Sequence, residues 1–160
     1  MKQGSTHFLR FTTFLLGTIV LAICMFGLPA MYHGSSAEFP GTSWALFIIT
    51  IILYVTAVPF YLALWHTLKL LRYIDENTAF SALSVDALRH IKHCAITMTV
   101  LYLGCVPFLI PIAEMDDAPG LIPIGAIVAC LPLVIAVFAA VLERLLQSAI
   151  AIKTENDLTV

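Results

Sequence analysis

The chain has 160 residues, of which 61% are hydrophobic and only 11% are charged, and its mean hydropathy is +0.99. Soluble domains are typically about half apolar and a quarter charged, so this composition excludes an ordinary soluble fold and indicates an integral membrane protein. The formal net charge of −2 is too small to indicate an acidic substrate or direct binding to nucleic acid.

The first apolar segment covers residues 11–31 and contains no charged residue. Its length matches the roughly 20 residues that a helix needs to cross a hydrocarbon core about 30 Å thick. A cleaved signal peptide is the alternative interpretation, because Lys2 and Arg10 precede the segment and small residues follow at 35–37. The apolar run is longer than the roughly 7 to 15 residues of a signal-peptide core, which favours an uncleaved membrane anchor.

A short loop is expected over residues 32–43, followed by a second span at about 44–67. Two tryptophans, Trp44 and Trp65, lie near the ends of this span. They are separated by about 31 Å of helix, so each indole can lie at one face of the bilayer. The sequence therefore predicts a helix that crosses the membrane from one aromatic anchor to the other.

Two further apolar segments follow a polar connection at residues 68–94. None of the four segments has a Lys, Arg, Asp or Glu near its centre, which argues against an ion-coupled pump or transporter. Four cysteines lie in or beside apolar runs: Cys24, Cys94, Cys105 and Cys130. We therefore expect them to be small buried side chains, and we expect no disulfide framework. The expected fold class is all-α, a four-helix integral membrane bundle in a single domain over 1–160, with spans at about 11–31, 44–67, 95–113 and 121–142.

The basic residues predict the orientation of the chain in the membrane. All eight lie on the same side of the four spans: Lys2, Arg10, Lys69, Arg72, Arg89, Lys92, Arg144 and Lys153. The positive-inside rule then places both termini and the polar connection in the cytoplasm. The predicted cytoplasmic parts are residues 1–10, 68–94 and 143–160.

The polar connection is expected to contain the cytosolic start of the third helix. Ser84 followed by Asp86 is typical of a helix N-cap with an acid in the first turn. Apolar residues then recur at helical spacing from Val85 to Ala95, so this helix should run continuously into the third span. A similar apolar stripe over residues 142–149 extends the fourth helix, and we expect the two extensions to pack as a small cytoplasmic helical layer.

Four side chains at the cytoplasmic edge form the one ligand-like cluster of the sequence: His66, His90, His93 and Cys94. His90 and Cys94 are four residues apart and can share a helix face, and such residues bind metals or haem. No metal-binding or phosphate-binding motif accompanies them, and a pair of titrating histidines at the membrane interface is the simpler interpretation. We therefore predict no metal and no cofactor.

Two polar segments resemble a known family. The first contains Phe80, Ser81, Ser84, Leu88, Arg89, Ile91, Lys92 and Ala95, and the second is the terminal run Glu155, Asn156, Asp157, Leu158, Thr159 and Val160. Together they are similar to the bacterial membrane family catalogued as domain of unknown function 2975. The resemblance implies a four-helix protein of the bacterial cell membrane with no established activity, often encoded beside a small helix-turn-helix regulator of the Cro type.

These observations favour a non-enzymatic membrane regulator or sensor that binds a cytosolic partner such as a helix-turn-helix transcription factor. The residues expected to contact the partner are Phe80, Ser81, Ser84, Leu88, Arg89, Ile91, Lys92, Glu155, Asn156, Asp157, Leu158 and Thr159. Two alternatives stay open: a membrane redox protein that binds haem or a small molecule through the histidines, and a permease or toxin-protection factor that uses the acidic turn at 114–117. The sequence does not predict the oligomeric state.

Overall fold

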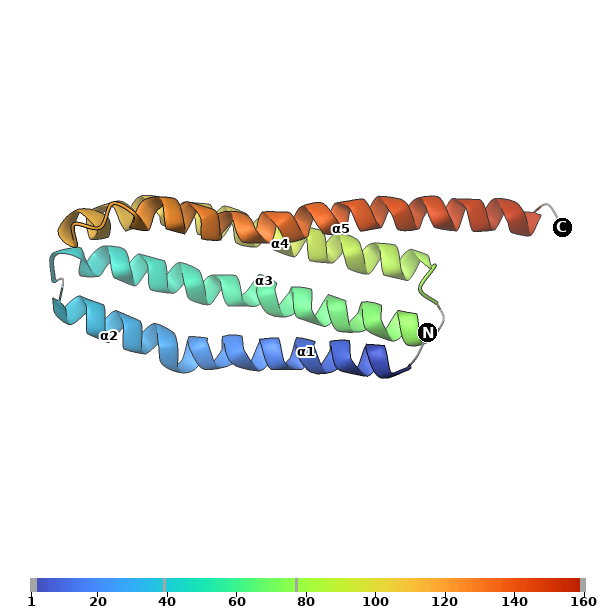
Figure 1. Cartoon of the computed structure of the whole chain (residues 1–160), viewed down its shortest axis with the longest axis horizontal. Coiled ribbons are helices and arrows are strands. Elements are labelled where there is room, and N and C mark those ends of the chain that lie inside the picture. The colour runs from blue at the N-terminus through green and yellow to red at the C-terminus, as the bar shows by residue number, and fades with distance from the viewer. Residues whose placement is uncertain (1–2, 39, 77, 159–160) are drawn as a thin grey trace.

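The computed structural model describes residues 3–38, 40–76 and 78–158, and every regular element in that part of the chain is helical. The elements are α1 (Gln3–Ala22), a π-helical turn (Ile23–Gly27), α2 (Leu28–Glu38), a 3-10 turn (Pro40–Thr42), α3 (Ser43–Asp75), α4 (Ala82–Met115) and α5 (Leu121–Leu158). Figure 1 shows α1 and α2 as one rod, and successive rods run antiparallel.

Four helical rods are long and apolar enough to cross a membrane. They comprise Thr6–Gly34, Ser43–Asp75, Ala82–Met115 and Leu121–Asn156. The predicted all-α fold with four membrane spans is therefore confirmed. Each rod has between 29 and 36 residues, which exceeds the roughly 20 that a span requires, so the helices continue beyond the hydrocarbon core.

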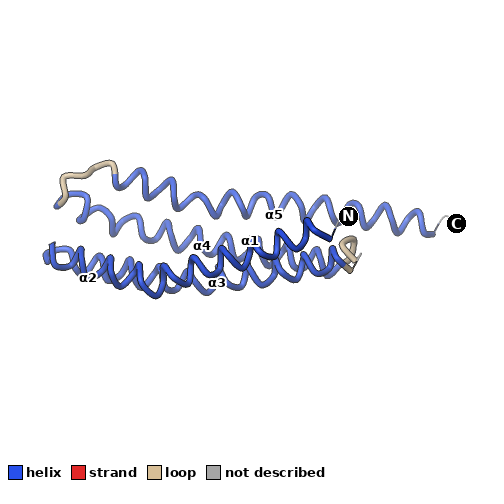
Figure 2. Tube along the Cα trace, turned by 60° about the horizontal axis from the view of Figure 1, so that its bottom comes forward, coloured by secondary structure: helices blue, strands red, loops and turns tan. Residues whose placement is uncertain are grey.

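The central helix is α4. It packs against α3 on one side and α5 on the other, whereas α1 and α2 pack against α3 (Figures 1 and 2). In the most apolar stretch of the first rod, 6% of the residues are buried, against 28%, 22% and 22% in the other three rods. The first rod is therefore a peripheral helix that lies mostly against lipid.

Small side chains form the contact between α4 and α5. Ala129 and Ala136 of α5 are buried, and Ala136 belongs to one cluster with Ala95 and Met98 of α4. Phe60 of α3 packs against this cluster, so three helices meet there. Small residues allow membrane helices to approach closely, and dispersion contacts then stabilise the pair where no hydrophobic driving force acts between lipid-embedded surfaces.

The π-helical turn after α1 leaves one carbonyl without a backbone donor because of Pro29. The Leu28 amide donates to the Ile23 carbonyl five residues earlier, so in this register the donor to the Cys24 carbonyl would be residue 29. Proline has no N–H. The hydroxyl of Tyr54 on α3 donates to the Cys24 carbonyl at 2.8 Å. Because an unsatisfied carbonyl is costly in hydrocarbon, this bond ties the first rod to α3.

Tyr54→Phe is expected to lower the free energy of unfolding by about 1 kcal/mol, since interhelical hydrogen bonds in membranes contribute roughly 0.6 to 2 kcal/mol. Pro29→Ala supplies an N–H for the same carbonyl, so the effect of Tyr54→Phe should shrink in that background. Unfolding by sodium dodecyl sulfate in mixed micelles, followed by circular dichroism, measures both losses. Tyr102→Phe is the control, because the Tyr102 hydroxyl makes no hydrogen bond to any residue that the structure describes. Equal losses in the two backgrounds would contradict this explanation.

The predicted loop at residues 32–43 is wrong over most of its length. α2 continues to Glu38, and α3 begins at Ser43 after the 3-10 turn. Between Pro29 and Pro40 no proline removes a backbone donor, and the single Gly34 is tolerated within the helix. The small residues of this segment permit a loop, but a helix accommodates them as well.

All four cysteines are free, in agreement with the expected absence of a disulfide framework. Cys105 is buried, and Cys24 and Cys94 are partly buried. The prediction of a buried side chain is wrong for Cys130, which is exposed. The preceding residue of α5, Ala129, is buried. Consecutive side chains of a helix point in different directions, so the Cys130 side chain points away from the bundle.

Candidate functional site

The basic residues gather at one end of the bundle, named the basic end from here on. This end holds the start of α1, the α3–α4 connection and the part of α5 that extends past the other helices (Figure 1). The described basic residues there are Arg10, Lys69, Arg72, Arg89, Lys92, Arg144 and Lys153. The opposite end holds the α2–α3 and α4–α5 turns, with Glu114, Asp116 and Asp117 in or beside the second of these.

The α4 helix starts earlier at the basic end than the sequence predicts. Its first residue is Ala82, and the N-cap position belongs to Ser81, whose backbone is extended with φ −137° and ψ 158°. The prediction of Ser84 as the N-cap is therefore wrong. Both serines suit an N-cap by residue type, but Ser84 lies within the first turn and is fully buried.

An apolar groove of about 450 Å³ opens at the basic end between α3, α4 and α5. It is named the end groove, and its lining includes Leu70, Ile74, Phe80, Leu88, Leu145 and Leu146. Phe80 is 61% exposed, and so is Leu145. Leu145 and Leu146 follow the predicted end of the fourth span at residue 142. An exposed apolar surface in that position is a candidate interaction site.

One carboxylate on α5 holds two cations of α4. The Arg89 Nε donates to Glu143 Oε1 at 3.1 Å, and the Lys92 Nζ donates to Glu143 Oε2 at 2.6 Å. Glu143 is buried, and the two cationic side chains that contact it supply much of its cover. The hydrogen bond from Lys92, followed by that from Arg89, lowers the pKa of Glu143 in spite of the opposing effect of desolvation. This cluster joins the cytosol-side extensions expected for α4 and α5.

The histidines of the predicted ligand cluster stack instead of converging. The rings of His66 and His90 have centroids 4.5 Å apart and planes within 11° of parallel. An imidazole binds a metal in its ring plane, so two rings stacked face to face cannot share one ion. His90 and His93 donate Nδ1–H to the carbonyls of Asp86 and Arg89 at 2.8 and 2.7 Å. Among the residues that the structure describes, no three His, Cys, Asp or Glu side chains gather as metal ligands.

The structure brings together part of the set expected to contact a partner. Phe80 and Leu88 line the end groove, and Arg89 and Lys92 hold Glu143. Of the other two members of the α4 stem, Ser84 is buried and Ile91 is half-buried. The half-buried Ser81 is the N-cap of α4.

The terminal segment lies beyond the end groove. α5 packs near the start of α4 as far as Ile150, which lines a second hollow with Ala82 and Val85. The helix then continues to Leu158, and Glu155 and Asn156 are exposed on it. Asp157 and Leu158 belong to this helix as well, whereas Thr159 lies outside the described residues. The two extensions therefore lie together as far as residue 150, and the described end of α5 projects past the other helices (Figure 1).

Glu143 is the residue of this site that sequence reasoning missed. It is the first acid after a long apolar segment. The available signal was its position opposite two cations at helical spacing, Arg89 and Lys92, at the same end of an adjacent antiparallel helix. The contributions of Leu70 and Ile74 to the end groove were also missed, because they come from the end of α3.

Comparisons with known proteins place the chain among uncharacterised membrane proteins. The model of a family described as "Protein of unknown function (DUF2975)" matches residues 30–160. The chain is 49% identical over 160 residues, 100% of each chain, to the "Uncharacterized membrane protein YoaS" of Bacillus subtilis (strain 168). No solved structure matches the chain.

Proposed function

The chain belongs to the DUF2975 family of proteins of unknown function, and from this premise we propose that it is a non-enzymatic regulator or sensor of the bacterial cell membrane that binds a cytosolic protein. The basic end carries the partner site. The partner class that the sequence resemblance implies is a small helix-turn-helix transcription factor. Both termini lie in the cytoplasm in this proposal, since the basic residues gather at one end of the bundle.

The end groove is the observation that carries this proposal. Its apolar lining lies at the end of the bundle where the polar and charged residues are found, and a contiguous apolar surface in that position marks an interaction site. A groove between helices suits an amphipathic helix, which lays its apolar face into the groove. Phe80 is an aromatic anchor for such a contact, because it is exposed before the partner binds and can be desolvated afterwards.

The composition of the spans supports a binding role over transport or catalysis. Transport pathways and proton relays usually need ionisable groups inside the membrane. The four predicted spans have no Lys, Arg, Asp or Glu near their centres. The stacking of His66 on His90 also supports a binding role over a metal or haem shared between α3 and α4.

Phe80→Ala is expected to reduce capture of the cytosolic partner at least ten-fold, since loss of an aromatic hot spot weakens binding by 2 kcal/mol or more. The measurement is affinity purification from crosslinked native membranes with quantitative mass spectrometry. Leu83→Ala is the matched control, because Leu83 is 59% exposed on the first turn of α4 and does not line the groove. Deletion of residues 154–160 tests the tail separately.

Two results would refute the proposal: no cytosolic protein enriched with the wild-type chain, or full capture by both Phe80→Ala and the tail deletion at normal membrane levels. Loss of capture on deleting the tail, with Phe80→Ala unaffected, would move the partner site from the end groove to the exposed helix that ends at Leu158.

A further inference from the structure

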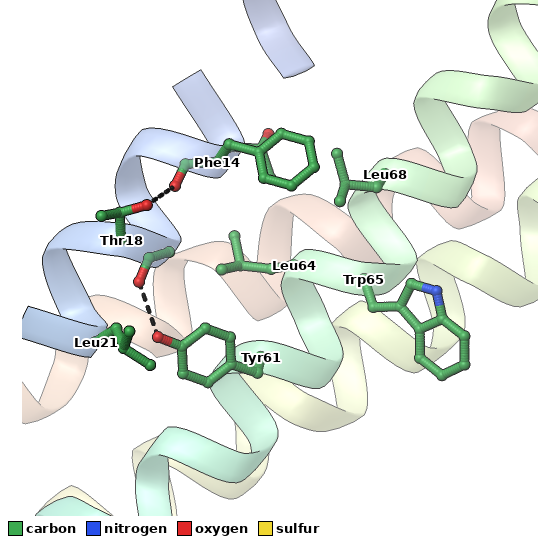
Figure 3. A pocket seen from close by; sticks show the side chains of 9 residues that line it. Phe14, Thr18, Leu21, Tyr61, Leu64, Trp65 and Leu68 are labelled. Atoms are coloured by element: carbon green, nitrogen blue, oxygen red, sulfur yellow. Dashed lines mark hydrogen bonds between the residues drawn. The ribbon is translucent and has the colours of Figure 1, made fainter. Parts of the chain in front are cut away.

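Two apolar hollows lie on the membrane-spanning part of the bundle, away from the end groove. The first, of about 370 Å³, is bounded by α1 and α3, and its walls include Phe14, Gly17, Leu21, Tyr61, Leu64 and Leu68 (Figure 3). The second, of about 450 Å³, lies along α3 beside Ala57, Val58 and Leu62. Tyr61 and Trp65 line both hollows, so these two side chains form a ridge between them.

Two polar contacts join α1 and α3 at the first hollow. At the basic end, the Arg10 guanidinium of α1 pairs with the Asp75 carboxylate of α3 at 2.9 Å. Deeper in the membrane, the Tyr61 hydroxyl donates to the Gly17 carbonyl at 2.8 Å (Figure 3). Between these two points Leu64 and Leu68 face α1, while Trp65 points away from it (Figure 3). The two helices are therefore joined by one contact at the basic end and by another within the lining of the hollow.

A cation lies at the basic-end edge of the ridge. The Lys69 ammonium is 4.4 Å from the centroid of the Trp65 ring, a distance that suits a cation–π contact. Within the described ranges no carboxylate lies at ion-pair distance from Lys69, whereas its neighbour Arg72 is paired with Glu76. Lys69 follows the predicted end of the second span, so its charge lies at the depth of lipid headgroups and still lacks an anion.

Each hollow follows α3 over part of the depth of one lipid leaflet. The α3 lining of the first runs from Leu68 to Tyr61 and that of the second from Trp65 to Ala57, which at 1.5 Å per residue is about 10 Å and about 12 Å along the helix axis. Half of a hydrocarbon core of about 30 Å is about 15 Å deep. An acyl chain that enters beside Lys69 can thus follow either hollow toward the bilayer midplane.

We propose that the ridge formed by Tyr61, Trp65 and Lys69 is a binding site for one anionic phospholipid with two acyl chains. One chain occupies the hollow between α1 and α3, and the other lies in the hollow along α3. The phosphate contacts the Lys69 ammonium above the ridge that separates them. The apolar walls recognise the chains, and the unpaired cation selects an anionic headgroup over a zwitterionic one. This inference does not depend on the end groove or on a protein partner.

The test uses the two tryptophans as reporters of bound lipid. In Trp44→Phe, the remaining Trp65 reports on the site; in Trp65→Phe, the remaining Trp44 reports from the other end of α3. Each variant is reconstituted in phosphatidylcholine vesicles containing brominated phosphatidylglycerol or brominated phosphatidylcholine, and fluorescence quenching gives the relative binding constant. At Trp65 we expect the binding constant of phosphatidylglycerol to exceed that of phosphatidylcholine about five-fold, which is the effect of one lysine near a membrane surface. At Trp44 we expect no such preference.

Lys69→Gln in the Trp44→Phe background is expected to abolish the preference, whereas Lys153→Gln, which removes an equal charge from the end of α5, should leave it. A ratio near one at Trp65, or a preference that survives Lys69→Gln, would overturn the proposal. Brominated lysophosphatidylglycerol, with a single chain, should quench Trp65 less at equal mole fraction; equal quenching would overturn the assignment of two chains. Helical circular dichroism of each variant verifies that the bundle is intact.

Discussion

Replacement of Glu143 by alanine is expected to lower the free energy of unfolding by about 3 kcal/mol. The change removes the carboxylate that accepts hydrogen bonds from Arg89 and Lys92. Hydrogen bonds to charged groups contribute roughly 1.5 to 3 kcal/mol, and removing one partner of a buried ion pair costs about 3 to 5 kcal/mol. The Arg89 side chain is 51% exposed, so water screens part of the interaction and the loss falls at the lower end.

Unfolding by sodium dodecyl sulfate in mixed micelles measures this loss. Glu114→Ala is the matched control, because it removes an exposed carboxylate at the opposite end of the bundle and should change stability by less than about 0.5 kcal/mol. A double-mutant cycle with Lys92→Ala should give a coupling energy of at least about 1 kcal/mol. Additive effects of the two substitutions would show that the ion pair does not stabilise the α4–α5 contact.

The same carboxylate predicts how stability depends on pH. Its pKa is lowered from the ordinary value of 4.5 in the folded chain, chiefly by the hydrogen bond from Lys92. A carboxyl group with a lowered folded-state pKa contributes its stabilisation above the unfolded pKa and loses it as the pH falls through the folded pKa. The difference in stability between wild type and Glu143→Ala should therefore be constant above about pH 5 and narrow in more acidic solution. A difference that is unchanged in strong acid would contradict this linkage.

Ala136→Leu is expected to lower the free energy of unfolding by about 2 to 3 kcal/mol, because extra methylene groups in a packed core force neighbouring helices apart or into strained rotamers. Ala136 is 4% exposed and lies in one cluster with Ala95 and Met98, with Phe60 packed against them. A leucine at this position fills space that the α4 backbone and side chains already occupy. The small residue is therefore a condition for the close approach of α4 and α5.

Val137→Leu is the control for this substitution, because Val137 is the next residue on α5 and is 57% exposed. Its replacement should change stability by less than about 0.5 kcal/mol. Met98→Ala in the Ala136→Leu background should recover part of the loss by making room on α4. If Ala136→Leu is as stable as Val137→Leu, the α4–α5 contact does not depend on small side chains.

The long helices were predictable, and most of their ends were not. The stem of α4 illustrates the first point: Val85 and Leu88 are buried, the helix continues into the third span, and the stripe from Val85 to Ala95 had predicted this. The N-cap illustrates the second, because Ser81 and Ser84 differ in backbone geometry and not in residue type. The helix through residues 32–38 was missed for a similar reason, since small residues permit a loop without requiring one.

The candidate site was less predictable than the spans. Phe80 and Leu88 were identified from the resemblance, but the groove that they line also needs Leu70 and Ile74 from α3 and several leucines of α5. The histidines had a spacing that suits ligands, and their rings stack instead. The spacing of residues along one helix predicts which of them share a face. It does not predict how that face packs against another helix.

The sequence by itself determined four membrane spans and the gathering of basic residues at one end, and it predicts that two helices continue beyond the bilayer. These properties depend on the transfer free energy of each segment, which is a sum over consecutive residues. Only the tertiary structure decided that Glu143 holds Arg89 and Lys92, 54 and 51 residues away in the chain, and that Tyr54 satisfies the Cys24 carbonyl. In a helix that is apolar on every side, composition does not distinguish the face that packs on protein from the face that contacts lipid, so these pairings arise from shape and a few polar contacts.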